Sequence, residues 1–403
     1  YYPINIMSLP EGTVVPNKTC IAAVENTHAD FAWLVDYIET SLLRAVWYSS
    51  TVATLSYRVK SMLNKYAVKM GLDPSIIDFK LHNFGDRGAS SSESAYLAGM
   101  AHLTSFLGTD CFMALDAVEH FYNFDFENDG VAGFSVNASQ HSTITSWENE
   151  IDAFENMILK FGGFTSDGRP KIVACVSDSY NIWKALEFWK MLEDEIIESG
   201  CVLVIRPDSG CPIKTPVNVI KRLIELFGYT EHEHNGKMFK TLPSYIRVIQ
   251  GDGVSEVSIG QILEHMYNDG LSLENIAFGM GGELTQKTNR DTCKWAMKGS
   301  HISGVSEVEN DGEVVIETFS RGFNKNPIGT SHWEDTPSGE SFKSSFSGKV
   351  CLMLDDDGNY VQELLTPENK SKNLLKTVFK DGIMVVDEHF NTIRSRINNK
   401  IGL

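Results

Sequence analysis

The chain shows a repeating hydrophobic pattern from Phe79 onward. A short apolar or β-branched run ends in a cluster of polar or glycine residues, and a helical stretch follows. Seven such clusters occur, marked by His82, Asp110, His141, Asp178, Asp208, Asp252 and Gly281. Successive markers are separated by 28, 31, 37, 30, 44 and 29 residues, which is close to the length of one βα unit. The pattern therefore predicts seven βα units.

Seven consecutive βα units favour an irregular (β/α) barrel, in which the polar residues that follow the strands meet at one mouth. The alternative is an open doubly wound sheet, which also binds ligands at the carboxyl ends of its strands. The repeat ends near Lys298. Residues 301–365 are strand-like and rich in Gly and Ser, and residues 381–394 are typical of a strand followed by a helical tail.

The two ends of the chain predict a second domain of the α+β class. Within residues 13–75, a strand-like run at 20–25 precedes long helical patterns. We therefore predict a catalytic (β/α) barrel domain over residues 76–300 and a smaller domain built from residues 1–75 and 301–403. Because the chain starts at Tyr1 inside a strand-like pattern, we also expect a preceding segment in the natural protein.

Composition narrows the class of function. Lys and Arg number 35 and Asp and Glu number 53, so the net charge of −18 disfavours binding to nucleic acid or to anionic membranes. No run of residues approaches the ~20 apolar positions of a membrane span. The seven cysteines are scattered without zinc spacing, so we expect free thiols in a cytoplasmic protein and no metal site made by the chain itself. An acidic substrate would require the few basic residues to be concentrated at one site.

Two strand ends carry carboxylates beside flexible or basic residues. Arg206 and Asp208 follow the apolar run 202–205 and point the same way, so together they can bind a phosphate and the hydroxyls of a ribose. A structural ion pair is the alternative. Gly251 and Asp252 repeat this arrangement, with a glycine that permits close backbone approach, although a tight turn explains them equally well.

A third cluster has the features of a phosphate cradle. Gly281 and Gly282 end a strand and precede a helical pattern that extends to Trp295, which predicts backbone N–H groups directed at an anion. Arg290 and Lys298 follow on that predicted helix and would add positive charge. Their alternative role is to form a solvated helix face.

Two further residues suggest chemistry on a ring and on a phosphoryl group. His141 closes one strand and Asp178 the next, and a histidine oriented by a carboxylate acts as a base or as a phosphoryl acceptor. The alternative is a structural histidine. Phe84 fits no core period and is placed to stack on a flat ring, unless it is simply packed in the core.

As an ordered set, these segments resemble the nicotinamide phosphoribosyltransferases, which are type II phosphoribosyltransferases that join nicotinamide to 5-phosphoribosyl-1-pyrophosphate. The resemblance rests on Leu81–Gly88, Gly108–Asp110, His141–Thr145, Val176–Tyr180, Arg206–Gly210, Val248–Val254 and Ile276–Asp291. It implies the irregular barrel of that family and the formation of nicotinamide mononucleotide in NAD salvage. It also implies a homodimer with its sites at the interface.

The resemblance implies a role for each site residue. For nicotinamide, Phe84 would stack on the pyridine ring, Asp110 would accept from the carboxamide NH₂, and Arg206 would lie near the base. The residues implied for the ribose and its 5′-phosphate are Asp208, Gly251, Asp252, Gly281, Gly282 and Arg290. Those implied for pyrophosphate are Arg87, His141, Arg206, Lys298 and Lys325.

The same resemblance implies a phosphorylated histidine. His141 would accept a phosphoryl group from ATP, a facultative co-substrate, with Asp178 as its orienting partner. Mg²⁺ would arrive on the pyrophosphate. The rival interpretations are a nicotinate-using relative and a binding protein without catalysis.

Three departures from the family pattern affect the phosphate chemistry. Residues 321–349 differ from the usual Lys-rich loop, which leaves Lys325, Lys343 and Lys349 as its equivalents. Met280 and Glu283 replace smaller residues at the phosphate cradle. Gln140 precedes His141 where an acidic residue is common.

Overall fold

A computed structural model describes residues 1–310, 313–324 and 345–402 of the chain. By their internal contacts, these residues form two compact units. The first contains Tyr1–Trp47 and Arg290–Glu388, and is called the small unit below. The second contains Tyr48–Asn289 and His389–Leu403, and is called the barrel unit.

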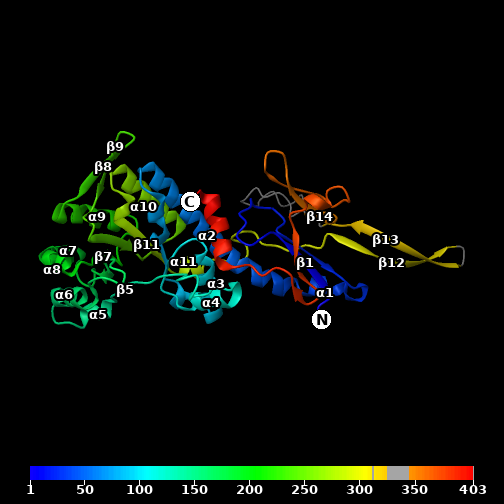
Figure 1. The fold of residues 1–403 in the computed structure, drawn as a ribbon, viewed down its shortest axis with the longest axis horizontal. Helices are drawn as coiled ribbons and strands as arrows, with labels where there is room; N and C mark the ends of the chain where they lie inside the picture. The colour runs from blue at the N-terminus through cyan, green and yellow to red at the C-terminus, as the bar shows by residue number, and fades with distance from the viewer. Residues whose placement is uncertain (311–312, 325–344, 403) are drawn as a thin grey trace, which may run out of the picture. The chain divides into compact units, whose positions relative to one another are not determined.

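The barrel unit is built on a seven-stranded sheet in the order β4-β3-β11-β10-β7-β6-β5 (Figure 1). Its strands are β3 (Leu81–Asn83), β4 (Gly108–Thr109), β5 (Asn137–Ala138), β6 (Ile172–Val176), β7 (Val202–Arg206), β10 (Ile246–Gln250) and β11 (Ile276–Met280). All neighbours are parallel. A further parallel bridge joins Gly108 to Phe134, just before β5, and brings the two sheet edges together. The predicted α/β fold with a curled, barrel-like parallel sheet is therefore confirmed.

Each of the seven predicted polar clusters lies at or directly after one of these strands. The longest interval, between Asp208 and Asp252, also contains a β-hairpin made of β8 (Thr230–His234) and β9 (Lys237–Thr241). The turn residues Asn235 and Gly236 both have positive φ. An Asn-Gly pair in that conformation is a signature of a two-residue hairpin turn, so the extra length of this βα unit has a local cause.

The strands of the sheet bury both of their faces. Leu203 and Val248 face the main core, where the helices pack. Ala174, Val204 and Ile249 face the other way and form a separate, small cluster. Because side chains alternate along a strand, this second set marks the interior of the barrel.

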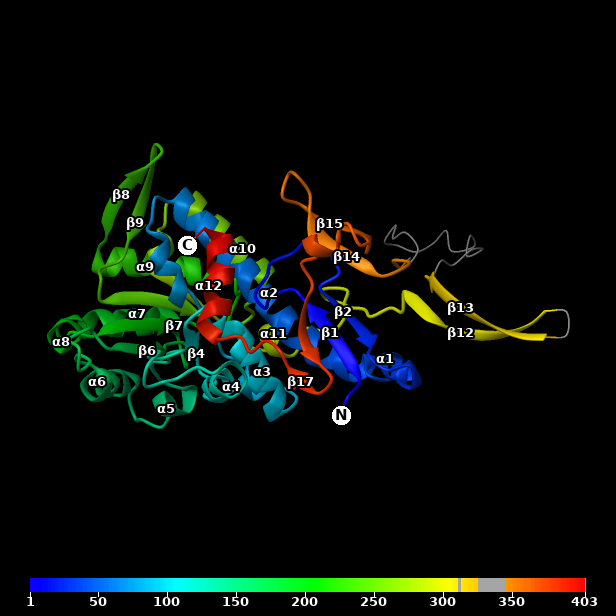
Figure 2. The same cartoon turned by 45° about the vertical axis from the view of Figure 1, so that its right-hand side comes forward.

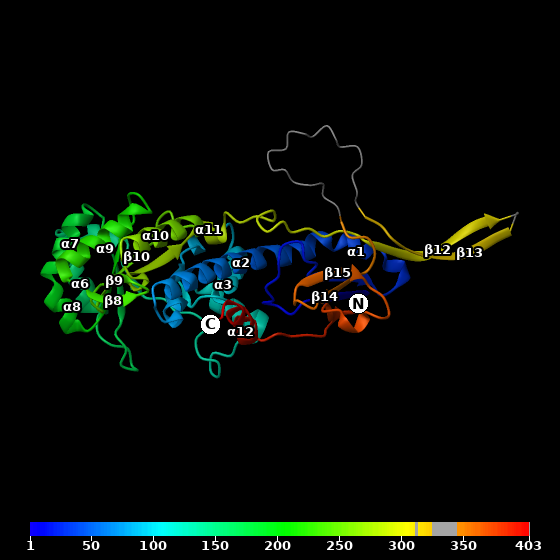
Figure 3. The ribbon, with the colours of Figure 1, turned by 90° about the horizontal axis from the view of Figure 1, so that it is seen from above.

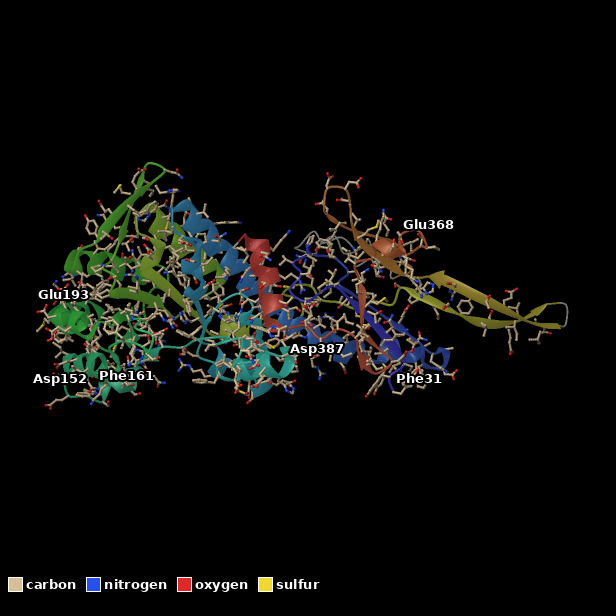
Figure 4. The ribbon with its side chains drawn as sticks, in the orientation of Figure 1. Phe31, Asp152, Phe161, Glu193, Glu368 and Asp387 are labelled. Carbon is tan, nitrogen blue, oxygen red and sulfur yellow. The ribbon has the colours of Figure 1, made fainter. Side chains whose placement is uncertain are left out.

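The helices of the barrel unit lie around the outside of the sheet (Figures 1 and 2). They are α2 (Glu39–Lys69, which starts in the small unit), α3 (Ser92–Leu103), α4 (Met113–Tyr122), α5 (His141–Thr145), α6 (Glu150–Phe161), α7 (Ile182–Met191), α8 (Glu193–Ser199), α9 (Lys214–Phe227), α10 (Glu256–Asn268), α11 (Gly282–Thr285) and α12 (Phe390–Ile401). Helix α6 shows the typical amphipathic spacing: Phe154, Met157 and Ile158 are buried, while Asp152 is exposed (Figure 4). Phe154 stacks on Trp189 of α7 with 4.2 Å between the ring centroids.

Two helices near the chain ends pack with the barrel unit. Helix α2 buries Leu63 in the main core, and α12 buries Phe390 in a neighbouring core cluster. The sequence assigned residues 48–75 and 389–403 to the smaller domain, whereas their contacts group them with the barrel unit. The apolar faces of these helices are covered there, which hydrophobic periodicity alone does not specify.

The small unit consists mainly of antiparallel strands, which include the paired ribbon of β12 and β13 (Figure 3). Its elements are α1 (Trp33–Tyr37), β1 (Ile4–Ser8), β2 (Ala22–Asn26), β12 (His301–Asn310), β13 (Glu313–Gly322), β14 (Val350–Leu354), β15 (Tyr360–Leu364), β16 (Lys376–Lys380) and β17 (Ile383–Met384). One sheet has the order β17-β16-β1-β2. Leu9, Leu352 and Leu375 form a core cluster in this unit.

Two features of the described residues concern the cysteines and the helices. The seven cysteines, all of which lie in the described ranges, are free thiols. Among residues 1–310, 313–324 and 345–402, no helix combines the length and the apolar character that a membrane crossing requires.

Candidate active site

The predicted site residues continue the inward-facing rows of the barrel strands. Ala174 on β6 and Val204 on β7 face the interior. Alternate residues of a strand share a face, so Arg206 extends the inward row of β7 to the carboxyl end of the sheet. Asp178 and Asp208 follow their strands by two residues each. The sheet therefore delivers these charged side chains to one mouth.

Phe84 lies directly after β3 and packs partly buried against the interior cluster. Its backbone N–H donates to the carbonyl oxygen of Met280 at 2.9 Å. Two glycines border the ring: a Cβ built on Gly251 would lie 3.2 Å from Phe84 Cε2, and one built on Gly279 would lie closer than 3.0 Å to three ring carbons. The ring thus occupies space that the missing side chains of β10 and β11 leave open.

Arg206 connects the ring to the neighbouring carboxylates. The carbon of its guanidinium group lies 5.7 Å from the centroid of the Phe84 ring. Its Nη2 donates to Oδ1 of Asp208 at 2.5 Å. Its Nε is buried and has no hydrogen-bond partner within the described residues. A buried donor without a partner is costly, so this atom is poised to bind an acceptor on a ligand.

His141 and Asp178 form the second cluster of the mouth. His141 begins α5 and exposes 47% of its side chain, whereas Asp178 exposes only 5%. His141 Nε2 lies 3.0 Å from Oδ1 of Asp178, and its Nδ1 lies 3.9 Å from Oδ2 of Asp208. The other oxygen of Asp178 accepts from the backbone N–H of Asp208 at 2.8 Å and from the hydroxyl of Ser209 at 2.5 Å.

These bonds determine the ionisation of Asp178. Burial by itself raises the pKa of this carboxyl, but the hydrogen bonds from Ser209, from the Asp208 backbone and from His141 together hold the pKa below its usual value. Asp178 is therefore a carboxylate at neutral pH. A carboxylate accepts a proton donor, so it selects the His141 tautomer that carries hydrogen on Nε2 and leaves the lone pair of Nδ1 free.

Asp110 lies after β4 and is exposed. Its Oδ1 accepts from the hydroxyl of Ser135 at 2.7 Å, and its backbone N–H donates to the carbonyl oxygen of Asn83 at 3.0 Å. Burial lowers the pKa of the nearby His82, an effect that the charge of Asp110 partly offsets. Asp110 therefore presents a carboxylate, with only one oxygen bound to Ser135, next to a strand that carries an aromatic ring at its end.

The predicted phosphate cradle packs against the loop of Phe84. Gly85 leaves no room for a side chain, because a Cβ there would approach Thr285 closer than 3.0 Å, and the hydroxyl of Thr285 donates to the carbonyl oxygen of Gly85 at 3.1 Å. A Cβ on Gly282 would meet nothing within 4 Å. Arg87 is exposed in the same loop. The open space around Gly282 is compatible with close approach of a ligand.

The prediction of a long helix after this cradle is wrong. Helix α11 ends at Thr285, because the carbonyl oxygen of Gly282 accepts from the N–H groups of both Gln286 and Lys287 and closes the last turn. Lys294 then adopts positive φ, which a continuing helix excludes.

Three of the predicted basic residues are not among the described residues of the barrel unit. Arg290 belongs to the small unit and pairs with Asp291 at 3.0 Å. Lys298 also belongs to the small unit and is exposed. Lys325, like Lys343, lies outside the described residues. Their predicted roles with phosphate and pyrophosphate stay predictions.

Two hydroxyl groups at the mouth were not predicted from the sequence as site residues. Ser209 holds Asp178 and Ser135 holds Asp110. Ser209 belongs to the Arg206–Gly210 motif, so its position beside two charged residues was an available signal. Ser135 was not singled out, because it reaches a carboxylate 25 residues earlier in the chain and gains its meaning only in the folded barrel.

In the part of the chain that the structure describes, no three His, Cys, Asp or Glu side chains come together as ligands for a metal ion.

Comparison with known proteins places this geometry in context. The model of the nicotinate phosphoribosyltransferase (NAPRTase) family matches residues 79–382. A nicotinamide phosphoribosyltransferase of Xanthomonas campestris pv. campestris is 41% identical over 404 residues, which cover 98% of this chain and 78% of that protein.

Two further relatives carry the same name. A nicotinamide phosphoribosyltransferase of Acinetobacter baylyi is 30% identical over 423 residues, covering 100% of this chain and 77% of that protein. One of Mycoplasma genitalium is 32% identical over 290 residues, covering 69% of this chain and 60% of that protein.

Proposed function

The chain belongs to the nicotinate phosphoribosyltransferase family, and from this membership we propose that it transfers the 5-phosphoribosyl group of 5-phosphoribosyl-1-pyrophosphate to nicotinamide. The products are nicotinamide mononucleotide and pyrophosphate, and the reaction is a step of NAD salvage. The observation that carries the proposal is the 41% identity to a protein named nicotinamide phosphoribosyltransferase along 98% of this chain.

The reaction requires displacement at the anomeric carbon of the ribose. The pyridine nitrogen attacks while pyrophosphate leaves, and the transition state resembles an oxocarbenium ion. A pyridine nitrogen carries no proton to remove, so catalysis depends on aiming the ring, neutralising the leaving group and excluding water. The residues of the mouth supply these functions and include no dedicated general base for the nucleophile.

The base stacks on Phe84, and Arg206 binds at its edge. The supporting geometry is the ring that lies beside Gly251 and Gly279, with the guanidinium group 5.7 Å from its centroid. The buried Nε of Arg206, which has no partner in the described ranges, supplies a donor to the base or to pyrophosphate. Asp208 and Asp252 accept from the ribose hydroxyls, while Gly281 and Gly282 face the 5′-phosphate.

Asp110 selects the amide form of the base. One carboxylate oxygen is held by Ser135, and the other accepts from the carboxamide NH₂ of nicotinamide. Nicotinate carries a second carboxylate at this position, which Asp110 repels. Selection against an analogue of the same shape is strongest where the site has a charged partner for the correct group.

ATP coupling proceeds through His141. With Nε2–H directed at Asp178, the free lone pair of Nδ1 attacks the γ-phosphorus of ATP, the bond from that phosphorus to the bridging oxygen of ADP breaks, and ADP leaves. Water later removes the phosphoryl group from His141. The phosphohistidine places extra negative charge at the mouth during one part of the cycle, which favours release of anionic pyrophosphate.

Mg²⁺ is carried to the mouth on the pyrophosphate of the substrate. A hard cation of this kind prefers phosphate and carboxylate oxygens, and the exposed carboxylate of Asp252 at the end of β10 fits that preference. The ion supplies charge neutralisation for the leaving group. Arg206 and Arg87 assist from the protein side.

The functional unit is proposed to be a homodimer with sites at the interface. Sedimentation of the active protein tests this directly. A dimer is the expected result, and a stable active monomer would contradict it.

The test of the reaction itself is pyrophosphate release with phosphoribosyl pyrophosphate, Mg²⁺ and either nicotinamide or nicotinate. Faster turnover of nicotinamide is expected. The rival favoured by the family name is a nicotinate-using enzyme, and a preference for nicotinate would support it. No release above background with either base would favour a binding protein.

A further inference from the structure

Gly279 has no role among the ligand-binding residues, yet its position is unusual. It is the fourth residue of β11, it is buried, and its φ lies outside the positive region that only glycine adopts easily. The backbone at this position therefore accepts any L-residue. The three atoms nearest to a Cβ at this position all belong to one ring: the Cβ would lie closer than 3.0 Å to Cε2, Cδ2 and Cζ of Phe84.

A second glycine lies beside the first, directly after the adjacent strand β10. Strands β10 and β11 pair with Gln250 opposite Phe278, so Gly251 and Gly279 come next in the same register. A Cβ on Gly251 would lie 3.2 Å from Phe84 Cε2 and 3.1 Å from Arg206 Nε. Two backbone segments without side chains, at Gly251 and Gly279, thus lie against one edge of the Phe84 ring. Gly251 also lies beside the Nε of Arg206.

From this arrangement we propose that Gly279 determines the position of the Phe84 ring and is thereby a positioning and specificity-determining residue for the base. The inference rests on the proposed function, in which Phe84 stacks on nicotinamide. Because the packed interior of a barrel does not expand easily, even one added methyl group must displace the ring. The displaced ring would invade the space of the base and lose its alignment with Arg206.

The experiment compares Gly279→Ala with a matched glycine substitution. Gly260 in α10 is the control, because a Cβ there meets only the sulfur and Cε of the flexible Met62, at 3.4 and 3.7 Å. For Gly279→Ala we expect kcat/KM for nicotinamide to fall by roughly 10- to 100-fold, since a shift of about 1 Å in a reacting group has effects of this size. The KM for phosphoribosyl pyrophosphate should stay within about twofold, and Gly260→Ala should change neither constant. The inference would be overturned if the KM for phosphoribosyl pyrophosphate rose by the same factor by which kcat/KM for nicotinamide fell.

A double-substitution cycle with Phe84→Ala separates ring displacement from general damage. If Gly279 acts only through the ring, adding Gly279→Ala to Phe84→Ala costs little further activity, because the clash partner is gone. Additive losses would contradict the inference. The same cycle is measured by thermal unfolding: Gly279→Ala should lower Tm in the parent chain and much less in the Phe84→Ala background.

The unfolding measurements distinguish failure of the proposed function from failure of the inference about Gly279. If the parent protein releases no pyrophosphate, the proposed function fails, while the unfolding cycle still reports whether Gly279 positions the ring. If the parent protein is active and Gly279→Ala behaves like Gly260→Ala, the inference fails and the proposed function stands.

Discussion

The two clusters at the barrel mouth are built by different physical means. On the Phe84 side, position comes from shape, because an aromatic ring fills space left by Gly251 and Gly279. On the His141 side, position comes from hydrogen bonds that converge on the buried carboxylate of Asp178. The first cluster is therefore expected to respond to volume, and the second to charge and pH.

This difference assigns separate tasks to the clusters. A stacked ring aims a flat, uncharged base, for which fit matters more than charge. A histidine with a carboxylate partner handles phosphoryl transfer, for which tautomer and ionisation matter most. The Arg206–Asp208 pair connects the two sides. Substitutions in the Arg206–Asp208 pair should impair both the aiming of the base and phosphoryl transfer. Substitutions in only one of the two clusters should impair only the task of that cluster.

The largest effect is expected from Arg206→Ala. It removes the donor that no described residue satisfies and leaves Asp208 without its cationic partner. The rate of phosphoribosyl transfer should fall by about 100- to 1,000-fold, which is typical for loss of one preorganised electrostatic group. Steady-state pyrophosphate release measures the loss.

Arg206→Lys tests the geometry of the same group. An ammonium group lacks the planar fork, so activity should stay well below that of the parent protein. Full activity with lysine would show that charge alone suffices and would remove the proposed link between the clusters.

His141→Ala should abolish ATP stimulation and leave measurable basal transfer. The ratio of rates with and without ATP is expected to fall to about one, because no other group at this position can accept the phosphoryl group. Thr145→Ala, an exposed residue of the same short helix, is the matched control. Undiminished stimulation in His141→Ala would refute the phosphohistidine.

Asp110→Asn should change the choice of base more than the rate of transfer. An amide nitrogen in place of a carboxylate oxygen repels the carboxamide NH₂ but donates to a carboxylate, so the nicotinamide-to-nicotinate ratio of kcat/KM should fall by about 10- to 100-fold. The exposed Asp116→Asn on α4 removes the same charge and should leave the ratio unchanged. An unaltered ratio in Asp110→Asn would show that another residue selects the base.

The smallest effect is expected from Ser209→Ala. Loss of the hydroxyl donor lets the pKa of Asp178 rise toward its usual value. Because the folded-state pKa is depressed, Asp178 contributes stability that is present above its unfolded pKa of about 3.9 and is lost as pH falls through the folded pKa.

Unfolding free energy measured against pH tests this contribution. In Ser209→Ala the loss of stability on acidification should be smaller than in the parent protein and should be complete at higher pH, because the folded-state pKa of Asp178 lies closer to the unfolded one. Ser209→Thr should restore the parent behaviour. Identical pH profiles for all three proteins would show that the hydroxyl does not control Asp178.

The strand ends were predictable from sequence because parallel strands bury both faces and appear as apolar runs that stop at polar residues. Asp178, Asp208 and Asp252 were located in this way. The pairing of Ser135 with Asp110 was not, because it depends on the bridge between Gly108 and Phe134 that brings the sheet edges together.

The main error in the predicted fold was the length of one helix. The pattern from Leu284 to Trp295 has helical spacing, but backbone bonds from Gln286 and Lys287 to Gly282 end the helix early. The contact of Gly279 was equally hidden from sequence reasoning, since it depends on the ring of Phe84, which follows a strand nearly 200 residues earlier in the chain. Local pattern predicts elements, whereas close contacts between distant segments decide how those elements end and what they exclude.

The comparison of nicotinamide with nicotinate tests the central claim most directly. Pyrophosphate release by the full-length protein, with phosphoribosyl pyrophosphate and Mg²⁺, should show a higher kcat/KM for nicotinamide. A higher kcat/KM for nicotinate would contradict the role assigned to Asp110, and no release with either base would contradict the transferase itself.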